Sequence, residues 1–447
     1  MKKYLALSVV ASTLLMAGGD VKPVEPVVEA VEEESVGTFS GQFRAFYIDR
    51  TYSGILENNR NSLAVGGWVG YDSSDWNGWS VGFKAYGVEG LRIHDGSAPD
   101  LGAASYDPSL YGGDFDNYGF FGEAYVNYSG ENINFKIGRQ KLNTPLAGAD
   151  DARMLPNLFE AAVASYTGFS NTTLVLGHVT QESVGTFGNV YPESSLSLQS
   201  GYGLGFKQGT SGNFANMGDI ALGDNDLNGD GSTDNGTSGV TVGAAIYKNE
   251  GLTLQLWDYY AWDILNAIYL SADYGWSMGD SVKMKASAQY INQSEVGDSF
   301  AGDVDSNYWG VKLGASSGAL SGYIAYSQTG DSDGAVNGGI ITPWGGMPAY
   351  TQGMVTRHQF LSGTDAWKVA GTYKFSEYNV KATAYYASFG VGDTATYAAG
   401  ADTEEAGFDI QYQATEALNL RLRANYPTDF TPGLDWSEYR IIANYNF

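Results

Sequence analysis

The sequence predicts an all-β protein, a transmembrane antiparallel β-barrel of about 18 strands with short periplasmic turns and long external loops. Three observations support this prediction. Segments of about ten residues alternate between apolar and polar side chains, which is the period of a β-strand. The connections between these segments are alternately short and long. The chain also stops on an aromatic residue, Phe447, at the end of an alternating segment.

The last segment, Trp436–Phe447, shows the alternation most clearly. One face of the expected strand carries Tyr439 and Ile441, and the other carries Glu438 and Arg440. A strand with one apolar and one polar face is stable in lipid only in a closed barrel, where every backbone N–H and C=O is paired. A terminal phenylalanine on such a strand is typical of bacterial outer-membrane barrels, whose assembly machinery recognises it. The expected location is therefore the outer membrane.

The composition excludes several classes of protein. The 447 residues include no Cys, which rules out disulfides, thiolate catalysis and Cys-based zinc sites. The net charge of −26 argues against nucleic acid as a partner, because nucleic acid needs a basic surface. Apart from a short leader, no segment approaches the length of apolar sequence that a membrane-spanning helix requires. The 32 Tyr residues suit the aromatic girdles of a membrane barrel.

The N-terminal residues predict export across the inner membrane. Residues 1–19 have the features of a signal peptide, with two lysines, an apolar run over Tyr4–Met16 and small residues after it. Residues 20–37 are rich in Pro, Val and Glu and are expected to form an acidic periplasmic lead-in. The barrel domain is expected to span residues 38–447.

The expected strands are justified by the connections between them. Eight short connections have the residues of tight turns, and pairing strands around them, with one unpaired strand at each end, gives about 18 strands. At this strand number side chains cannot fill the interior, so a water-filled lumen is expected. The short turns are Ser73–Gly78, Ser129–Asn132, Gly168–Asn171, Asn249–Gly251, Ser277–Asp280, Ser316–Ala319, Ser376–Tyr378 and Thr415–Ala417.

Strand alternation also places the basic residues. In Ser281–Tyr290, Lys283 and Lys285 fall on the face opposite Met284. A basic residue on the lipid face near the midplane would cost about 2–4 kcal/mol, so these side chains are expected to face the lumen. This basic track either hydrates the lumen and pairs with loop carboxylates or guides anionic solutes. It comprises Lys136, Lys283, Lys285, Lys312, Lys374, Lys381, Arg421, Arg423 and Arg440.

One long connection, residues 141–158, differs from the others. It combines apolar side chains that can pack on the barrel wall with a dense group of charges, a mixture that predicts a loop folded into the lumen. The apolar residues are Leu146, Met154 and Leu155, and the charged ones are Asp150, Asp151 and Arg153.

Residues in this loop and on the strands expected beside it match the sequence pattern of a known protein family. The matching pieces are Gly41–Arg44 with Tyr47 and Arg50, Gly138-Arg139 before Thr144-Pro145, and Asp150–Pro156 followed by Phe159-Glu160. On these residues the sequence resembles the OprD family of substrate-selective outer-membrane porins, in the type found in epsilonproteobacteria. The resemblance implies an 18-stranded channel narrowed by inward-folded loops, with basic wall residues facing acidic loop residues.

Carried over to this chain, the resemblance places Asp150, Asp151 and Arg153 at the pore constriction, with Arg44 and Arg139 on the wall beside it. A second interpretation of Asp151 and Arg153 is a pair that only fixes the loop's own fold. Much of the inward charge here is Lys where family members carry consecutive Arg. Since Lys cannot hold a carboxylate in two parallel hydrogen bonds, a more general pore is an alternative to a carboxylate-selective one.

The fourth long loop contains a calcium-loop pattern within residues 224–235. Alternate oxygen-bearing residues stand at positions 1, 3, 5, 7 and 9 of such a loop, with Gly231 at the sharp turn. Thr237 occupies the twelfth position in place of the bidentate Glu, which predicts weak binding of Ca²⁺. No other cofactor is expected. The candidate ligands are Asp226, Asn228, Asp230, Ser232 and Asp234.

These features predict passive diffusion of small hydrophilic solutes and ions through a constricted pore. The alternatives are a general cation-preferring pore, in which acidic loops dominate, and an abundant structural or adhesion barrel. No enzyme is expected, because the three His, at positions 94, 178 and 358, lie in separate segments without a nucleophile beside them. The expected surroundings are outer-membrane lipid and lipopolysaccharide. The sequence leaves both monomer and homotrimer open.

Overall fold

The computed structural model describes residues 36–91, 93, 106–112, 116–190, 211–223, 229, 231–232, 234–396 and 398–447. The expected signal peptide and most of the lead-in lie outside these residues. The described strands are β1 (Gly37–Gly54), β2 (Asn58–Ser73), β3 (Trp79–Leu91), β4 (Tyr118–Ser129), β5 (Ile133–Gln140), β6 (Leu158–Phe169), β7 (Thr172–Ser183), β8 (Ala215–Asn216), β9 (Val240–Asn249), β10 (Leu252–Ala261), β11 (Leu265–Met278), β12 (Val282–Ser294), β13 (Asp305–Ser317), β14 (Leu320–Thr329), β15 (Asp365–Phe375), β16 (Val380–Gly390), β17 (Asp402–Gln413), β18 (Leu418–Thr428) and β19 (Leu434–Asn446).

The strands form one closed antiparallel barrel. Each strand pairs with its neighbours in sequence, except that β7 pairs with β9 across the two-residue β8, which adds to β7 alone. The barrel closes where β1 pairs with β19 from Gln42 opposite Asn446 to Gly54 opposite Leu434. Without β8, the described part of the chain has 18 wall strands, as predicted.

The two faces of the wall differ as the alternation predicts. On β19, Tyr439 and Ile441 are 40% and 58% exposed on the outer face, whereas Glu438 and Arg440 are buried inside. Leu176 on β7 also points outward and is 64% exposed. Because membrane lipid covers the outer face, these exposed apolar side chains are in their expected surroundings. Among the described residues, no helix is long and apolar enough to cross a membrane.

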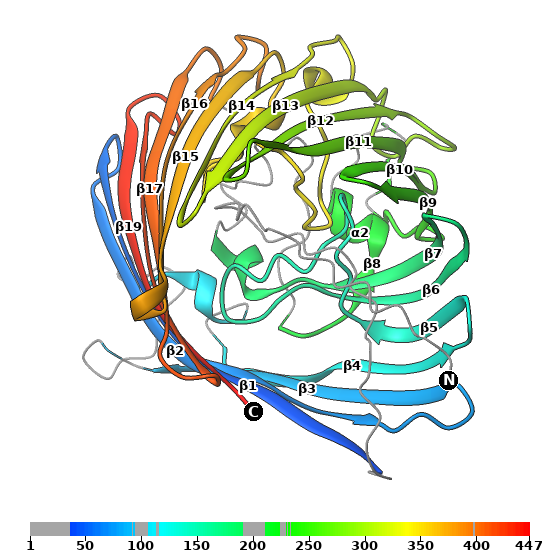
Figure 1. Cartoon of the computed structure of the whole chain (residues 1–447). Coiled ribbons are helices and arrows are strands. Elements are labelled where there is room, and N and C mark those ends of the chain that lie inside the picture. The colour runs from blue at the N-terminus through cyan, green and yellow to red at the C-terminus, as the bar shows by residue number, and fades with distance from the viewer. Residues whose placement is uncertain are drawn as a thin grey trace.

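The interior is partly filled by loops from one end of the barrel (Figure 1). A short helix, α2 (Met217–Leu222), buries Met217 and Ile220 against the loop after β5 and against Trp344. The expected open lumen is therefore narrowed by several connections together. The remaining described helices are short 3₁₀ turns: η1 (Pro108–Leu110), η3 (Thr186–Val190), η4 (Ala335–Gly338), η5 (His358–Phe360) and η6 (Ser376–Tyr378).

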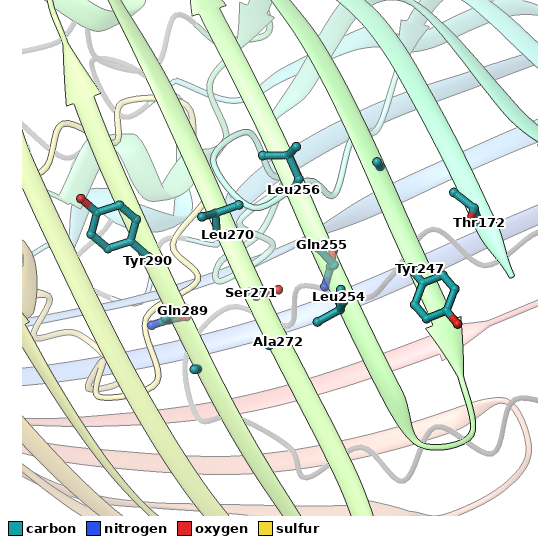
Figure 2. A pocket seen from close by; sticks show the side chains of 12 residues that line it. Thr172, Tyr247, Leu254, Gln255, Leu256, Leu270, Ser271, Ala272, Gln289 and Tyr290 are labelled. Carbon is teal, nitrogen blue, oxygen red and sulfur yellow. The ribbon is translucent and has the colours of Figure 1, made fainter.

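An apolar groove of about 520 Å³ crosses β9 to β12 on the outside of the wall (Figure 2). Leu254, Leu256 and Leu270 line it and are about two-fifths to one-half exposed. Because these side chains point outward, the groove faces membrane lipid and is not part of the pore. The candidate site lies inside the barrel instead.

Candidate functional site

The connection between β5 and β6, residues 141–157, lies inside the barrel. Leu146 is only 2% exposed, and its backbone N–H donates a 3.3 Å hydrogen bond to the Tyr259 hydroxyl on β10. The N–H of Gly148 donates to the carbonyl of Trp344 at 2.9 Å. The connection is thus fixed both to the wall and to a second loop.

The second loop, residues 330–364, also enters the barrel. Its Ile340 and Trp344 are fully or almost fully buried. A Cβ on Gly346 would lie 2.3 Å from the carbonyl carbon of Leu146, so the two loops touch backbone to backbone. This loop too combines apolar residues with charges, which are those of Asp331, Asp333 and Arg357.

Arg44 on β1 joins the inner wall to the first of these loops. Its guanidinium makes two parallel hydrogen bonds to the Asp151 carboxylate, Nη1–Oδ1 at 2.7 Å and Nη2–Oδ2 at 3.2 Å. It also donates from Nε to the Asn444 amide oxygen at 2.8 Å and from Nη1 to the Arg153 carbonyl. Bidentate pairing of this kind fixes orientation as well as charge.

Asp151 is the member of this group that opens to the lumen, since its side chain is 38% exposed. Burial acts to raise the pKa of Asp151, but the charges of Arg44, Lys141 and Arg421 outweigh it and hold this pKa below its usual value. One carboxylate therefore faces three basic side chains. Arg44 is paired with Asp151 and Arg421 with Asp409, so the positive charge in excess of these pairs is that of Lys141.

Arg153 points away from the lumen into a buried charge cluster. Its side chain is 1% exposed, and its Nη2 lies 3.6 Å from Glu438 Oε1. Glu438 also pairs with Arg50 at 2.5 Å and with Arg440, while Arg50 lies 3.4 Å from Asp107. Burial and the neighbouring arginine charges lower the pKa of Arg153 to about 9. Arg153 braces the constriction, and its ion pair is with Glu438, while Asp151 pairs with Arg44.

Asp150 makes a different contact, to the second loop. Its Oδ2 lies 3.0 Å from Arg357 Nη2, and both side chains are at most 6% exposed. Loss of either partner would leave a buried charge without compensation, which typically costs about 3–5 kcal/mol. Sequence reasoning did not assign Arg357, because its partner lies 207 residues away.

Glu405 on β17 is a wall residue that the sequence interpretation also missed. Its buried carboxylate accepts hydrogen bonds from the backbone N–H groups of Met354 (2.6 Å) and Thr356 (2.7 Å). The N–H of Val355 and the Tyr385 hydroxyl also donate to it. The loop backbone is therefore held on the wall by one carboxylate. Only the tertiary fold brings these successive N–H groups to it.

The basic track lies on the inner face, but most of its members have partners. Lys285 lies 3.1 Å from Asp273, and Arg421 donates from Nε to both oxygens of Asp409. Arg423 lies 3.3 Å from the same Asp409.

Other members of the track lie over aromatic rings, with Lys136 Nζ at 3.9 Å from the Tyr125 centroid and Lys312 Nζ at 4.3 Å from that of Tyr350. Lys283 and Lys374 are exposed, and Lys381 is half-buried.

The expectation that Arg139 lines the constriction does not agree with its position. Ile137, two residues earlier, is 47% exposed on the outer face, and alternation puts Arg139 on that same face. Arg139 pairs with Glu160 on β6 at 3.6 Å and lies over the Phe214 ring. The rule that places Lys136 inside therefore places Arg139 outside.

The calcium-loop ligands Asp226, Asn228 and Asp230 lie outside the described residues. Ser232 and Asp234 are exposed, and Asp234 accepts a 3.3 Å hydrogen bond from the N–H of Gly236. Within the described ranges there is no group of three or more His, Cys, Asp or Glu residues placed to hold a metal ion.

The closed barrel and its inward loops agree with comparisons to known proteins. A model of the OprD family, described as an outer membrane porin family, matches residues 35–447. The chain belongs to the OprD family. This porin is accordingly an outer-membrane protein, and its family and fold are those of a transport channel. A search of curated proteins finds no match.

Solved structures with the same fold cover almost the whole barrel. OccAB3 of Acinetobacter baumannii aligns with a TM-score of 0.71 at 15% identity, covering 92% of this porin and 99% of that chain. A BenF-like porin from Pseudomonas fluorescens aligns at 0.70 and 17% identity, covering 92% and 98%. OccK9 (OpdG) of Pseudomonas aeruginosa aligns at 0.68 and 19%, with the same coverage.

Proposed function

We propose that this porin admits small organic anions that carry a carboxylate group, and that residues 141–157 form its constriction. The proposal rests on the surroundings of Asp151. Its partly exposed carboxylate is paired bidentately with Arg44 and lies near Lys141 and Arg421. An excess of basic groups at the narrow point favours anions over cations.

A carboxylate solute can pass this point by exchanging with the Asp151 carboxylate. The planar guanidinium of Arg44 presents two donors in the geometry that a carboxylate accepts. Asp151 then competes for the same donors and displaces the solute onward. Such competition keeps binding weak enough for exit, as conduction requires.

The inner wall offers further contacts of the same kind. Lys136 and Lys312 each lie over a tyrosine ring, so an anion that carries an aromatic group has both a charge and an apolar surface to contact. OpdK of Pseudomonas aeruginosa, whose structure was determined with vanillate, aligns with this chain at a TM-score of 0.67 and 18% identity. Vanillate is an aromatic carboxylate, which agrees with this class of solute.

The test is single-channel recording of the purified porin in a planar bilayer across a tenfold KCl gradient, followed by addition of benzoate. We expect the sign of the reversal potential to show that anions permeate better than cations. We also expect benzoate to reduce the chloride current. Arg44→Gln should weaken both effects. Glu160→Gln, which changes an outward-facing carboxylate, is the matched control and should leave them unchanged.

One observation favours a second candidate, a general cation-preferring pore. Much of the basic track is neutralised by wall carboxylates, as in the Lys285–Asp273 and Arg421–Asp409 pairs. Acidic loop residues such as Asp303 and Asp333 then set the field at the mouth. Cation preference without an effect of benzoate would establish this candidate. No conductance at all would point to a structural or adhesion role.

We also propose that Ca²⁺ orders the loop around residues 224–235 through Asp226, Asn228, Asp230, Ser232 and Asp234. Protease cleavage between residues 210 and 240 should then be slower with calcium than with a chelator. Equal cleavage rates would contradict calcium binding.

For biogenesis, we propose that residues 1–19 direct export and that the assembly machinery recognises Phe447. Cross-linking in lipid would distinguish a homotrimer from a monomer.

A further inference from the structure

Glu182, at the end of β7, is a buried carboxylate that the pore chemistry does not use. Its side chain has no exposed surface. Neither of its oxygens accepts a hydrogen bond from any residue that the structure describes. An ionised carboxylate without a partner is costly in a protein interior, so such a group calls for a specific compensating ligand.

Glu182 borders a small internal cavity between the two inward loops and the wall. The cavity measures about 20 Å³. A single water-sized particle needs about 10–15 Å³, so the cavity has room for one such particle. Its lining comes from three parts of the chain, and includes Asp150 and Asn157 of one loop, Thr342 and Arg357 of the other, and Glu182 of the wall.

With Glu182 ionised, the charges around this cavity leave one negative charge without a counterion. Asp150 is neutralised by Arg357, whose Nη2 lies 3.0 Å from its carboxylate. The Asp150 carboxylate also lies near enough to Glu182 to repel its charge. Thr342 adds a buried hydroxyl oxygen, which likewise has no hydrogen-bond partner among the described residues. With Glu182 ionised, the cavity thus combines a net charge of minus one with oxygen atoms from the wall and from the second loop.

We propose that this cavity binds one monovalent alkali-metal cation, with the Glu182 carboxylate as its charged ligand and the Thr342 hydroxyl as a neutral one. Hard cations prefer oxygen ligands, and a single charge matches the deficit. A divalent ion such as calcium would exceed this deficit by one charge. The bound ion ties both inward loops to β7 and so steadies the constriction. This inference does not depend on which solute the pore admits.

The direct test is crystallography of the porin grown in rubidium chloride, because rubidium scatters anomalously. An anomalous peak beside the Glu182 carboxylate is expected in the wild-type protein, and its absence is expected in Glu182→Gln. Thr342→Val, which retains the charge, should reduce the height of the peak. No peak at this cavity in the wild-type protein would overturn the proposal.

Single-channel recording in two salts measures the effect of the ion on the loops. Replacing KCl by N-methylglucamine chloride, whose cation is too large for the cavity, should increase brief sub-conductance closures in single-channel records. Glu182→Gln should show these closures in both salts, whereas Glu160→Gln should behave like the wild type. Closures that respond to pH but not to the cation would identify a protonated Glu182 and refute an alkali-metal site.

Discussion

Asp150 and Arg357 form a buried salt bridge, with 3.0 Å between Oδ2 and Nη2, across 207 residues of sequence. The pair joins the loop after β5 to the loop after β14, and neither loop is held by the wall alone. The constriction is therefore one unit built from two loops and the inner wall.

Arg357→Gln should loosen the two loops from one another. It leaves the Asp150 carboxylate buried without its partner, and we expect the docking of the loops to weaken by about 3–5 kcal/mol. Protease digestion of the folded porin in detergent should become faster at residues 330–364. Asp150→Asn combined with Arg357→Gln should be milder than either single change, because both charges of the pair are then removed together. An equally stable loop in Arg357→Gln would contradict this role.

Asp151→Asn should increase anion preference, because it removes a partly exposed negative charge and leaves the nearby positive charges of Arg44 and Lys141 without it. Two unit charges about 4 Å apart in water interact with an energy of about 1 kcal/mol, so removing the Asp151 charge should raise the permeability ratio of chloride to potassium about fivefold. Reversal potentials measure this ratio directly. Combining Asp151→Asn with Arg153→Gln should also change conductance without unfolding the barrel. Wild-type values in both variants would show that this loop is not the constriction.

Glu405→Gln should release the segment around Val355 from the wall. The carboxylate accepts hydrogen bonds from several backbone N–H groups. Weakening such charge-assisted hydrogen bonds typically lowers stability by about 1.5–3 kcal/mol. The expected result is a larger and noisier single-channel conductance. Glu404→Gln is the matched control, because Glu404 lies next to it but is exposed on the outer face. Identical records for the two variants would rule out the anchoring role.

His358 should make the docking of the second loop depend on pH. Its Nε2 lies 2.6 Å from the carbonyl oxygen of Phe430, and burial lowers the pKa of His358 from 6.5 to about 4. The loop-released state therefore binds a proton more readily than the docked state. Docking is strongest above pH 6.5 and weakens as the pH falls from there towards 4, by about 3 kcal/mol in total.

Protease cleavage within residues 330–364 should accordingly be faster at pH 5 than at pH 7. In His358→Gln, which cannot take up the proton, cleavage should lose this pH dependence. A wild-type porin cleaved at the same rate at both values would contradict the prediction.

The sequence by itself determined the barrel, because the period of two in each strand and the order of short and long connections are local properties. The same alternation was sufficient to place Lys136 and Arg421 on the inner face. It also contained the information that Arg139 points outward, although the family resemblance suggested otherwise. The apolar and charged residues in 141–158 identified the first inward loop for the same local reason.

Only the tertiary structure decided how the charges are paired. Arg44 with Asp151, Arg153 with Glu438, and Asp150 with Arg357 are all joined across the barrel interior. No spacing along the chain predicts these pairs, because closing the barrel and folding in the loops creates the distances. The buried state of Glu182 has the same origin, since the wall and both loops enclose it together.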